Sequence, residues 1–173
     1  AINKSDKAIA LYNTVESKYG FDERIIRQKQ RIYFHENKMD AALAEGQKLI
    51  DAYPNEPEYV LEQAQLLMSS DKIAEAGKLL QDVLVSNPEL VRAKLLISDI
   101  YRKQGDEQKA QEMMAEAISS PLLDFNAKLE VLTSYLRRSG QADQQKIGTN
   151  LAALTVQAHP KEAKAHAIYA DFL

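Results

Sequence analysis

The sequence predicts an all-α fold in which paired helices recur along the chain. Four alanines, Ala8, Ala42, Ala76 and Ala110, follow one another at a constant spacing of 34 residues. Other residue types recur with the same step: an aromatic or leucine (Tyr33, Leu67, Tyr101, Tyr135), a turn residue (Asn37, Asp71, Gly105, Ser139) and an apolar residue (Leu49, Val83, Ala117, Leu151). Hydrophobic residues at 45% and charged residues at 27%, with only five prolines, suit folded helices. A fixed period of this length is typical of stacked helical repeats.

Each recurring residue has a mechanical role in a helix pair. A small side chain in the second helix lets it approach the first closely, whereas a bulky one would overpack the crossing. Asn37, Asp71 and Gly105 stand where a short loop needs a left-handed residue, and Gly140 can serve beside Ser139. Asn87 and Pro88 are a candidate N-cap and first-turn proline.

The period divides the chain into a single array. We expect an unpaired second helix at 4–22, repeats at 23–56, 57–90 and 91–120, a longer divergent repeat at 121–159, and the first helix of a truncated repeat at 160–173. Gln144 stands where the next alanine is due, and the step from Ala93 to its equivalent Ala165 is 72 residues rather than 68. The fourth repeat is therefore expected to have longer helices, at 121–139 and 143–158. The chain begins without methionine and ends inside a helical pattern, so we expect a piece of a longer protein.

This pattern resembles the tetratricopeptide-repeat (TPR) family. The resemblance implies a right-handed α-solenoid of helix-turn-helix repeats, in which the first helix of each pair, helix A, lines a concave surface and the second, helix B, lies outside it. Aligned on the alanine of the family's repeat, the sequence should begin its A helices near Glu23, Pro57, Val91 and Phe125 and its B helices near Met39, Ile73, Glu107 and Gln141. The sequence departs from the family pattern at two columns and contains no tryptophan. The fourth residue of helix A, a large aromatic in the family, is Ile26, Val60, Lys94 and Lys128; the eighth, a glycine in the family, is Gln30, Ala64, Ser98 and Leu132.

Composition argues against several functional classes. The formal charge of −3 gives no general attraction for nucleic acid, and no apolar run has the roughly 18 residues of a membrane-spanning helix. There are no cysteines, the glycines are scattered singly, and His35, His159 and His166 are too far apart for a metal pair on one helix face. We therefore expect no cofactor, no metal site and no catalytic residues.

The resemblance places the second, fifth, ninth, twelfth and thirteenth residues of helix A on the concave surface. The candidate partner-binding residues are Arg24, Arg27, Arg31, Leu61, Gln65, Met68, Leu95, Asp99, Arg102 and Leu129, and Phe34 is also among these positions. Arg24, Arg27 and Arg31 share one helical stripe and could hold a carboxylate or an acidic peptide; the alternative is a solvated face. Leu61, Leu95 and Leu129 could anchor an apolar segment; the alternative is packing between helices.

Some family members clamp a C-terminal carboxylate with lysine, asparagine and arginine at the fifth and ninth positions of helix A. Arg27, Arg31, Gln65, Leu95 and Asp99 stand at those places, so that mode is not expected here. The function predicted first is a non-catalytic module that binds a protein or peptide. The alternatives are an assembly scaffold that self-associates through its open C-terminal helix, and a recruiting arm of an enzyme whose catalytic domain lies elsewhere. The compartment stays open, with a slight preference for an exported bacterial protein.

Overall fold

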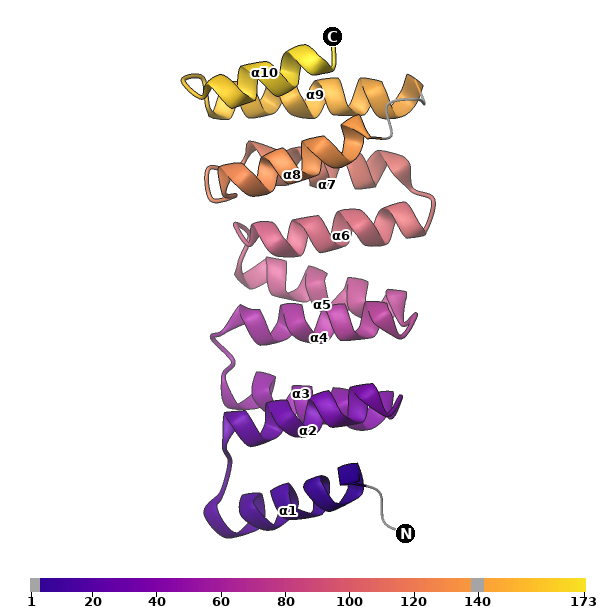
Figure 1. Cartoon of the computed structure of the whole chain (residues 1–173), viewed down its shortest axis with the longest axis vertical. Helices are drawn as coiled ribbons and strands as arrows, with labels where there is room; N and C mark the ends of the chain where they lie inside the picture. The colour runs from indigo at the N-terminus through magenta and orange to yellow at the C-terminus, as the bar shows by residue number, and fades with distance from the viewer. Residues whose placement is uncertain (1–3, 138–141) are drawn as a thin grey trace. The chain divides into compact units, whose positions relative to one another are not determined.

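The computed structural model describes residues 4–137 and 142–173, which form ten helices and no strand (Figure 1). The chain separates into two compact units, residues 1–83 and 84–173, and α5 runs from the first into the second. The helices are α1 Lys4–Tyr19, α2 Glu23–His35, α3 Met39–Ala52, α4 Pro57–Ser69, α5 Ile73–Ser86, α6 Val91–Lys103, α7 Glu107–Ser119, α8 Phe125–Leu136, α9 Ala142–Ala158 and α10 Ala163–Asp171.

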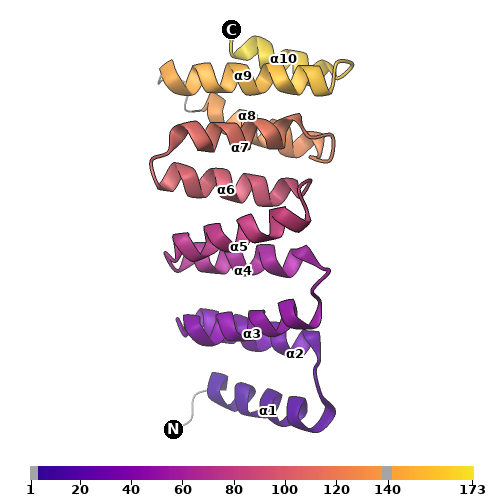
Figure 2. The same cartoon turned by 180° about the vertical axis from the view of Figure 1, so that it is seen from behind.

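Unit 1 is built from helices packed against their neighbours in the sequence. α1 contacts α2, α2 contacts α3, and α3 contacts α4. Figures 1 and 2, which view the chain from opposite sides, both show α2 and α3 side by side. The starts of α2, α3, α4 and α5 are the residues predicted from the alignment with the family's repeat.

Unit 2 follows the same plan. α6 contacts α7, α8 contacts α9, and α10 contacts both α8 and α9. α9 also contacts α7, so successive B helices meet in this unit. α6, α7 and α8 begin at the predicted residues, whereas the predicted start of the next helix, Gln141, lies outside the described residues.

The alanine column lies at the helix crossings, as predicted. Ala42, Ala76 and Ala110 are all buried, with at most 2% of their surface exposed. In unit 2 the hydroxyl of Ser98, the eighth residue of α6, donates a hydrogen bond of 2.7 Å to the carbonyl of Ala110 in α7. The small residues thus allow two helix backbones to approach within reach of one short side chain.

The turns between paired helices use left-handed residues, as predicted. Asn37 has φ 56°, Asp71 has φ 62° and Gly105 has φ 80°, a region that glycine, asparagine and aspartate tolerate best. Ser139 and Gly140 lie outside the described residues.

The N-caps differ from the prediction. Asn87 does not cap α6, because that helix begins at Val91, with Leu90 as its N-cap residue. The side chains that accept hydrogen bonds from first-turn amides belong to Asp22 before α2, Asp106 before α7 and Asp124 before α8. A carboxylate there also complements the positive end of the helix dipole.

The extra length of the fourth helix pair lies in one helix rather than in both. α9 has 17 residues against 14, 14 and 13 in α3, α5 and α7, whereas α8 has only 12. The prediction of a longer helix over 121–139 was therefore wrong: in the described residues α8 ends at Leu136, and the added turn is at the end of α9.

Two glycines occupy the same repeat position and are packed differently. Gly46 in α3 and Gly148 in α9 are both the 24th residue counted from the start of the preceding helix A. A Cβ at Gly46 would collide with the amide ends of Gln30 and Gln63, and one at Gly148 would collide with the ring of Phe172. Polar side chains from α2 and α4 fill this position in unit 1, and an aromatic ring that follows α10 fills it in unit 2.

A buried ion cluster joins three helices of unit 1. The ammonium of Lys29 in α2 lies 2.7 Å from Glu16 in α1 and 2.8 Å from Glu45 in α3. Lys48 contacts the same two carboxylates at 3.0 Å each. Burial alone would lower the pKa of Lys29, but the hydrogen bonds to Glu16 and Glu45 outweigh it and hold that pKa above its ordinary value. The same contacts lower the pKa of Glu16, chiefly through Lys29.

Unit 2 has a mainly apolar core with a different buried lysine. The core includes Val91, Met114, Ile118, Leu132, Leu151 and Phe172. Lys128 in α8 is fully buried, and its Nζ lies 3.1 Å from Nε2 of His159, whose ring packs edge-on against Phe125. Among the described residues, no carboxylate pairs with the Lys128 ammonium. Burial therefore lowers the pKa of Lys128.

Candidate functional site

The three arginines of the predicted basic stripe on α2 have different surroundings. Arg24 is exposed, and its guanidinium lies 3.1 Å from the carboxylate of Asp22, the N-cap residue of the same helix. Because this contact is between near neighbours on the surface, it contributes little to stability. Arg24 does not line the cavity that the other two arginines share.

Arg27 is held from two sides by carboxylates. Its Nε donates to Glu23 at 2.8 Å, and its Nη1 donates to both oxygens of Glu62 in α4, at 3.0 and 2.8 Å. The guanidinium also lies 5.2 Å from the ring centre of Tyr59. The hydrogen bond to Glu23, followed by that to Glu62, raises the pKa of Arg27. This arginine therefore ties α2 to α4.

A cavity of about 280 Å³ lies between α2 and α4; we call it the α2–α4 pocket. Its lining residues are Arg27, Gln30, Arg31 and Phe34 from α2 and Glu62, Gln65 and Leu66 from α4. Of the predicted binding residues, the structure brings Arg27, Arg31 and Gln65 together here, with Phe34 beside them. The sequence analysis did not single out Glu62, although it follows Arg27 by one period plus one residue, a spacing that brings successive A helices together.

Two polar side chains of the α2–α4 pocket are unpaired. Among the described residues, neither Arg31 nor Gln65 has a hydrogen-bond or ion-pair partner, and both are exposed. Phe34, one helical turn after Arg31, is 38% exposed. Gln30 contributes to the wall, but its amide nitrogen points toward Gly46. The pocket therefore presents one free guanidinium, one free amide and an apolar surface.

The leucine column does not form a continuous binding strip. Leu61 has no exposed surface and belongs to the core of unit 1, so its assignment as a partner-binding residue is corrected: helix packing occupies it. Met68 on α4 is half-buried. Leu95 is half-buried and packs against the core of unit 2.

The candidates in unit 2 lie in two separate cavities. Leu95, Asp99 and Arg102 line one of about 240 Å³, together with Met114, Val131, Ser134 and Tyr135. Arg102 is 2.8 Å from Asp99 and 3.3 Å from the hydroxyl of Tyr135. Leu129 lines another cavity of about 440 Å³ along α8, with Asn126, Glu130, Thr133, Ser134 and Arg137.

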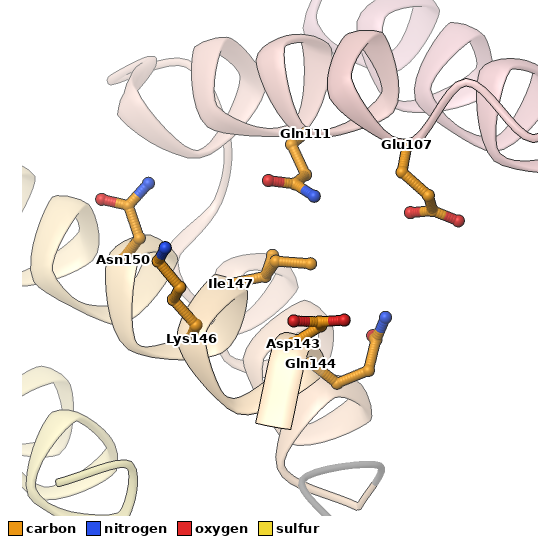
Figure 3. Close-up of a pocket in the computed structure, with 7 residues that line it drawn as sticks. All are labelled: Glu107, Gln111, Asp143, Gln144, Lys146, Ile147 and Asn150. Atoms are coloured by element: carbon orange, nitrogen blue, oxygen red, sulfur yellow. The ribbon is translucent and has the colours of Figure 1, made fainter. Parts of the chain in front are cut away.

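A further cavity, of about 470 Å³, lies between the B helices of unit 2 (Figure 3). Figure 3 shows Glu107 and Gln111 extending from α7 toward α9, where Asp143, Gln144, Lys146, Ile147 and Asn150 line the other wall. We call it the α7–α9 pocket. The sequence analysis gave no prediction for it; the one available signal was Gln144, the residue that replaces alanine in the small-residue column.

Histidine and carboxylate side chains of the described residues are not clustered in a way that would bind a metal ion. In residues 4–137 and 142–173, no group of three or more histidine, aspartate or glutamate side chains is placed to hold a metal ion. His159 contacts Lys128, and His166 contacts the carbonyl of Pro160 at 2.9 Å. No helix in these two stretches is both long enough and apolar enough to cross a membrane.

Comparison with known sequences found a related curated protein. No family model matches the chain. The TPR repeat-containing protein YpiA of Bacillus subtilis strain 168 is 26% identical over 133 residues, which cover 69% of this chain and 31% of YpiA. The chain thus spans about a third of the length of this relative.

Solved structures resemble the chain over nearly its whole length. MamA has a TM-score of 0.58 with 15% identity and covers 96% of this chain and 99% of its own. TTC0263, a thermophilic TPR protein of Thermus thermophilus, has a TM-score of 0.54, 16% identity and coverages of 98% and 90%. YrrB, described as a TPR protein with an unusual peptide-binding site, has a TM-score of 0.55, 14% identity and coverages of 95% and 84%. With the 34-residue period and the left-handed turns, these similarities show that the chain has an all-α fold of helix hairpins, a solenoid like that of the tetratricopeptide-repeat proteins.

Proposed function

We propose that this chain is a non-catalytic module that binds an extended segment of a protein partner on the A-helix face of unit 1. The observation that carries the proposal is the α2–α4 pocket, where Arg31 and Gln65 are unpaired beside the exposed ring of Phe34. A concave site with an apolar wall and a few polar groups is the usual form of a ligand pocket. YrrB, a fold relative, is a peptide-binding TPR protein, which supports the same class of ligand.

The size of the pocket favours an extended segment over a partner helix. A helix with its side chains is about 10 Å wide. A cavity of about 280 Å³ between two neighbouring helices has room for a few side chains of a ligand, but not for a whole helix. Side chains of an extended peptide can enter such a cavity while the amide of Gln65 pairs with the peptide backbone. Adjacent A helices can then contact successive residues of the partner.

Selection of peptides tests this function directly. A displayed library of random 12-residue peptides is selected on the whole chain, and the binders are retested against a Phe34→Ala, Gln65→Ala double variant. Both residues are at least partly exposed, so the fold should persist. We expect the affinity to fall about tenfold or more, since both a buried contact and a hydrogen bond are lost.

A matched double variant on the other helix layer provides the control. Gln111→Ala with Asn150→Ala removes two side chains of the α7–α9 pocket (Figure 3). Peptide affinity should stay within about twofold of the original, as expected for surface substitutions outside a binding site. Loss of binding in this control, with retention in the α2–α4 variant, would place the site on the B helices and overturn the proposal.

One observation favours a scaffold role as a second candidate. α10 leaves Ala163, Ala167 and Ala170 exposed, and Leu173 after it is 80% exposed. Small side chains allow close helix contact, so this surface could pair with another copy of the chain. Sedimentation velocity over a hundredfold range of concentration tests it: a constant monomer sedimentation coefficient would exclude self-association through α10.

A further inference from the structure

We infer that the α2–α4 pocket recognises a single internal aspartate or glutamate of the partner, followed or preceded two residues away by an apolar side chain. The inference rests on the proposed function and specifies the chemistry of its ligand. Three observations lead to it: the pairing state of each arginine, the charge of the pocket wall, and the spacing of Arg31 and Phe34.

The first step identifies the guanidinium that is available. Asp22 occupies Arg24, and Glu23 and Glu62 together occupy Arg27. Arg31 lines the pocket and has no partner among the described residues. A free guanidinium binds a carboxylate through two parallel charge-assisted hydrogen bonds. Arg31 is thus the cation that a partner would meet.

The second step limits the ligand to one negative charge. Of the two guanidinium groups that line the pocket, Arg27 is already paired with Glu23 and Glu62, so Arg31 is the one that can take up a negative charge from the ligand. Glu62 directs both of its oxygens to Nη1 of Arg27 at 2.8 and 3.0 Å. A second carboxylate from the partner would have to approach Arg27 beside Glu62, where like charges repel. Glu62 therefore lowers the affinity of the pocket for segments that bring two acidic side chains to it.

The third step sets the spacing of the motif. Arg31 and Phe34 are three residues apart on α2, so their side chains emerge on the same face about 5–6 Å apart. In an extended peptide, residues i and i+2 point to the same side at about 6–7 Å. An acidic residue at i and an apolar residue at i+2, in either chain direction, match Arg31 and the Phe34–Leu66 surface.

The carboxylate is assigned to a side chain within the partner rather than to its C-terminus. The pocket is bounded by both α2 and α4, and the free amide of Gln65 comes from the second of these helices. A chain that continues beyond its acidic residue can reach Arg31 and Gln65 together. A terminal carboxylate at Arg31 would leave the peptide on one side of the guanidinium only.

Nuclear magnetic resonance titration of the whole chain with blocked peptides tests the inference. The main probe is acetyl-Ala-Glu-Ala-Leu-Ala-amide, compared with its Glu→Gln analogue. The acidic peptide should shift the Arg31 Nε–Hε resonance and the Gln65 side-chain amide, and should bind about tenfold more tightly than the analogue. Arg31→Gln should remove this preference, whereas Arg24→Gln, a change on the same helix outside the pocket, should preserve it within about twofold.

Two further probes separate the alternatives. Acetyl-Ala-Ala-Ala-Leu-Ala with a free C-terminus supplies a terminal carboxylate alone, and tighter binding of this probe than of the main probe would overturn the assignment to a side chain. Acetyl-Glu-Ala-Glu-Ala-Leu-Ala-amide supplies two charges on the same side of an extended chain; it should gain at least about threefold in affinity when Glu62→Gln removes the like charge.

The outcomes distinguish this inference from the proposed function. If the Gln analogue binds as tightly as the acidic peptide and still shifts the Gln65 resonance, the carboxylate is unnecessary while the binding surface stands. If no probe shifts a resonance of the pocket and selected peptides ignore the Phe34 and Gln65 substitutions, both fail.

Discussion

The interiors of the two units contain the same kind of buried group in opposite surroundings. Lys29 in unit 1 lies between the carboxylates of Glu16 and Glu45, whereas Lys128 in unit 2 has the imidazole of His159 as its partner. Both side chains are almost wholly buried. A buried ammonium costs free energy unless a counter-charge is close, so these two lysines should affect stability in opposite directions.

The comparison also shows what each lysine replaces. Lys128 is the fourth residue of its helix A, where the repeat family has a large aromatic side chain, so it takes an apolar position. Lys29 is three residues beyond the equivalent position in α2, which Ile26 fills. In unit 1 the charge is an addition that ties α1 to α2 and α3; in unit 2 it substitutes for packing.

The largest effect is expected from Lys29→Met. Removing the ammonium leaves Glu16 and Glu45 facing each other with only Lys48 between them. Breaking a buried ion pair in this way costs about 3–5 kcal/mol of the free energy of unfolding. Urea unfolding followed by circular dichroism measures it, with Lys78→Met as the exposed control. A loss below about 1 kcal/mol would mean that the cluster is solvated rather than buried.

Lys128→Met is expected to act in the opposite direction. The methionine fills a site that favours an apolar side chain and removes an ammonium with no counter-charge, so the free energy of unfolding should rise by about 1–3 kcal/mol. The matched control is Lys94→Met at the same repeat position in α6, where the lysine pairs with the half-exposed Glu116. That substitution should change stability by less than about 1 kcal/mol. A destabilising Lys128→Met would show that His159 compensates the charge.

The two lysines mark the limit of what could be predicted from the sequence. The 34-residue period predicts the left-handed turns, and its alignment with the family's repeat predicts the helix starts, because each depends on one residue type at one place. Lys29 depends on Glu16 and Glu45, which lie on two other helices, so its environment is set by tertiary contacts. A lysine in a helix is ordinarily exposed to solvent. The sequence around Lys128 does not differ from the sequence expected around such an exposed lysine.

The same limit explains the outcome at the candidate site. The family resemblance was enough to predict that Arg27, Arg31 and Gln65 face one side, and they line one pocket. It could not indicate which arginine is free, because Glu62 reaches Arg27 from the next helix pair. Leu61 was misassigned because a recurring leucine fits a groove and a core equally well. Burial decides between them only once neighbouring helices are placed.

Two glycines allow the comparison to be repeated with uncharged groups. Gly148→Ala must displace the ring of Phe172, whose burial contributes about 1.5–3 kcal/mol, while alanine returns about 1 kcal/mol of helix propensity. A net loss of about 0.5–2 kcal/mol in urea unfolding is expected. Gly46→Ala displaces the amide ends of Gln30 and Gln63 and so weakens the hydrogen bond from Gln63 to the carbonyl of Leu43. The gain in helix propensity offsets this loss of about 1 kcal/mol, so the net effect should be near zero. Equal losses at both sites would contradict this reading of the packing.

The smallest effect is a difference in how stability depends on pH, and its sign separates the two lysines. The pKa of Lys128 is lowered by burial, so between that pKa and the unfolded value near 10.4 the unfolded chain binds more protons, and stability rises with pH. The pKa of Lys29 is raised, so its contribution is complete below about 10.4 and is lost only as pH rises further. The two lysines therefore give different expectations above pH 8.

We expect the free energy of unfolding of the wild type, relative to Lys128→Met, to increase between pH 8 and 10. Relative to Lys29→Met, it should stay constant over the same range. The slope is at most about 1.4 kcal/mol per pH unit for one proton, within reach of urea titrations at pH 8, 9 and 10. A flat profile for Lys128 would mean that its ammonium is hydrated in the folded state, because burial is what lowers its pKa.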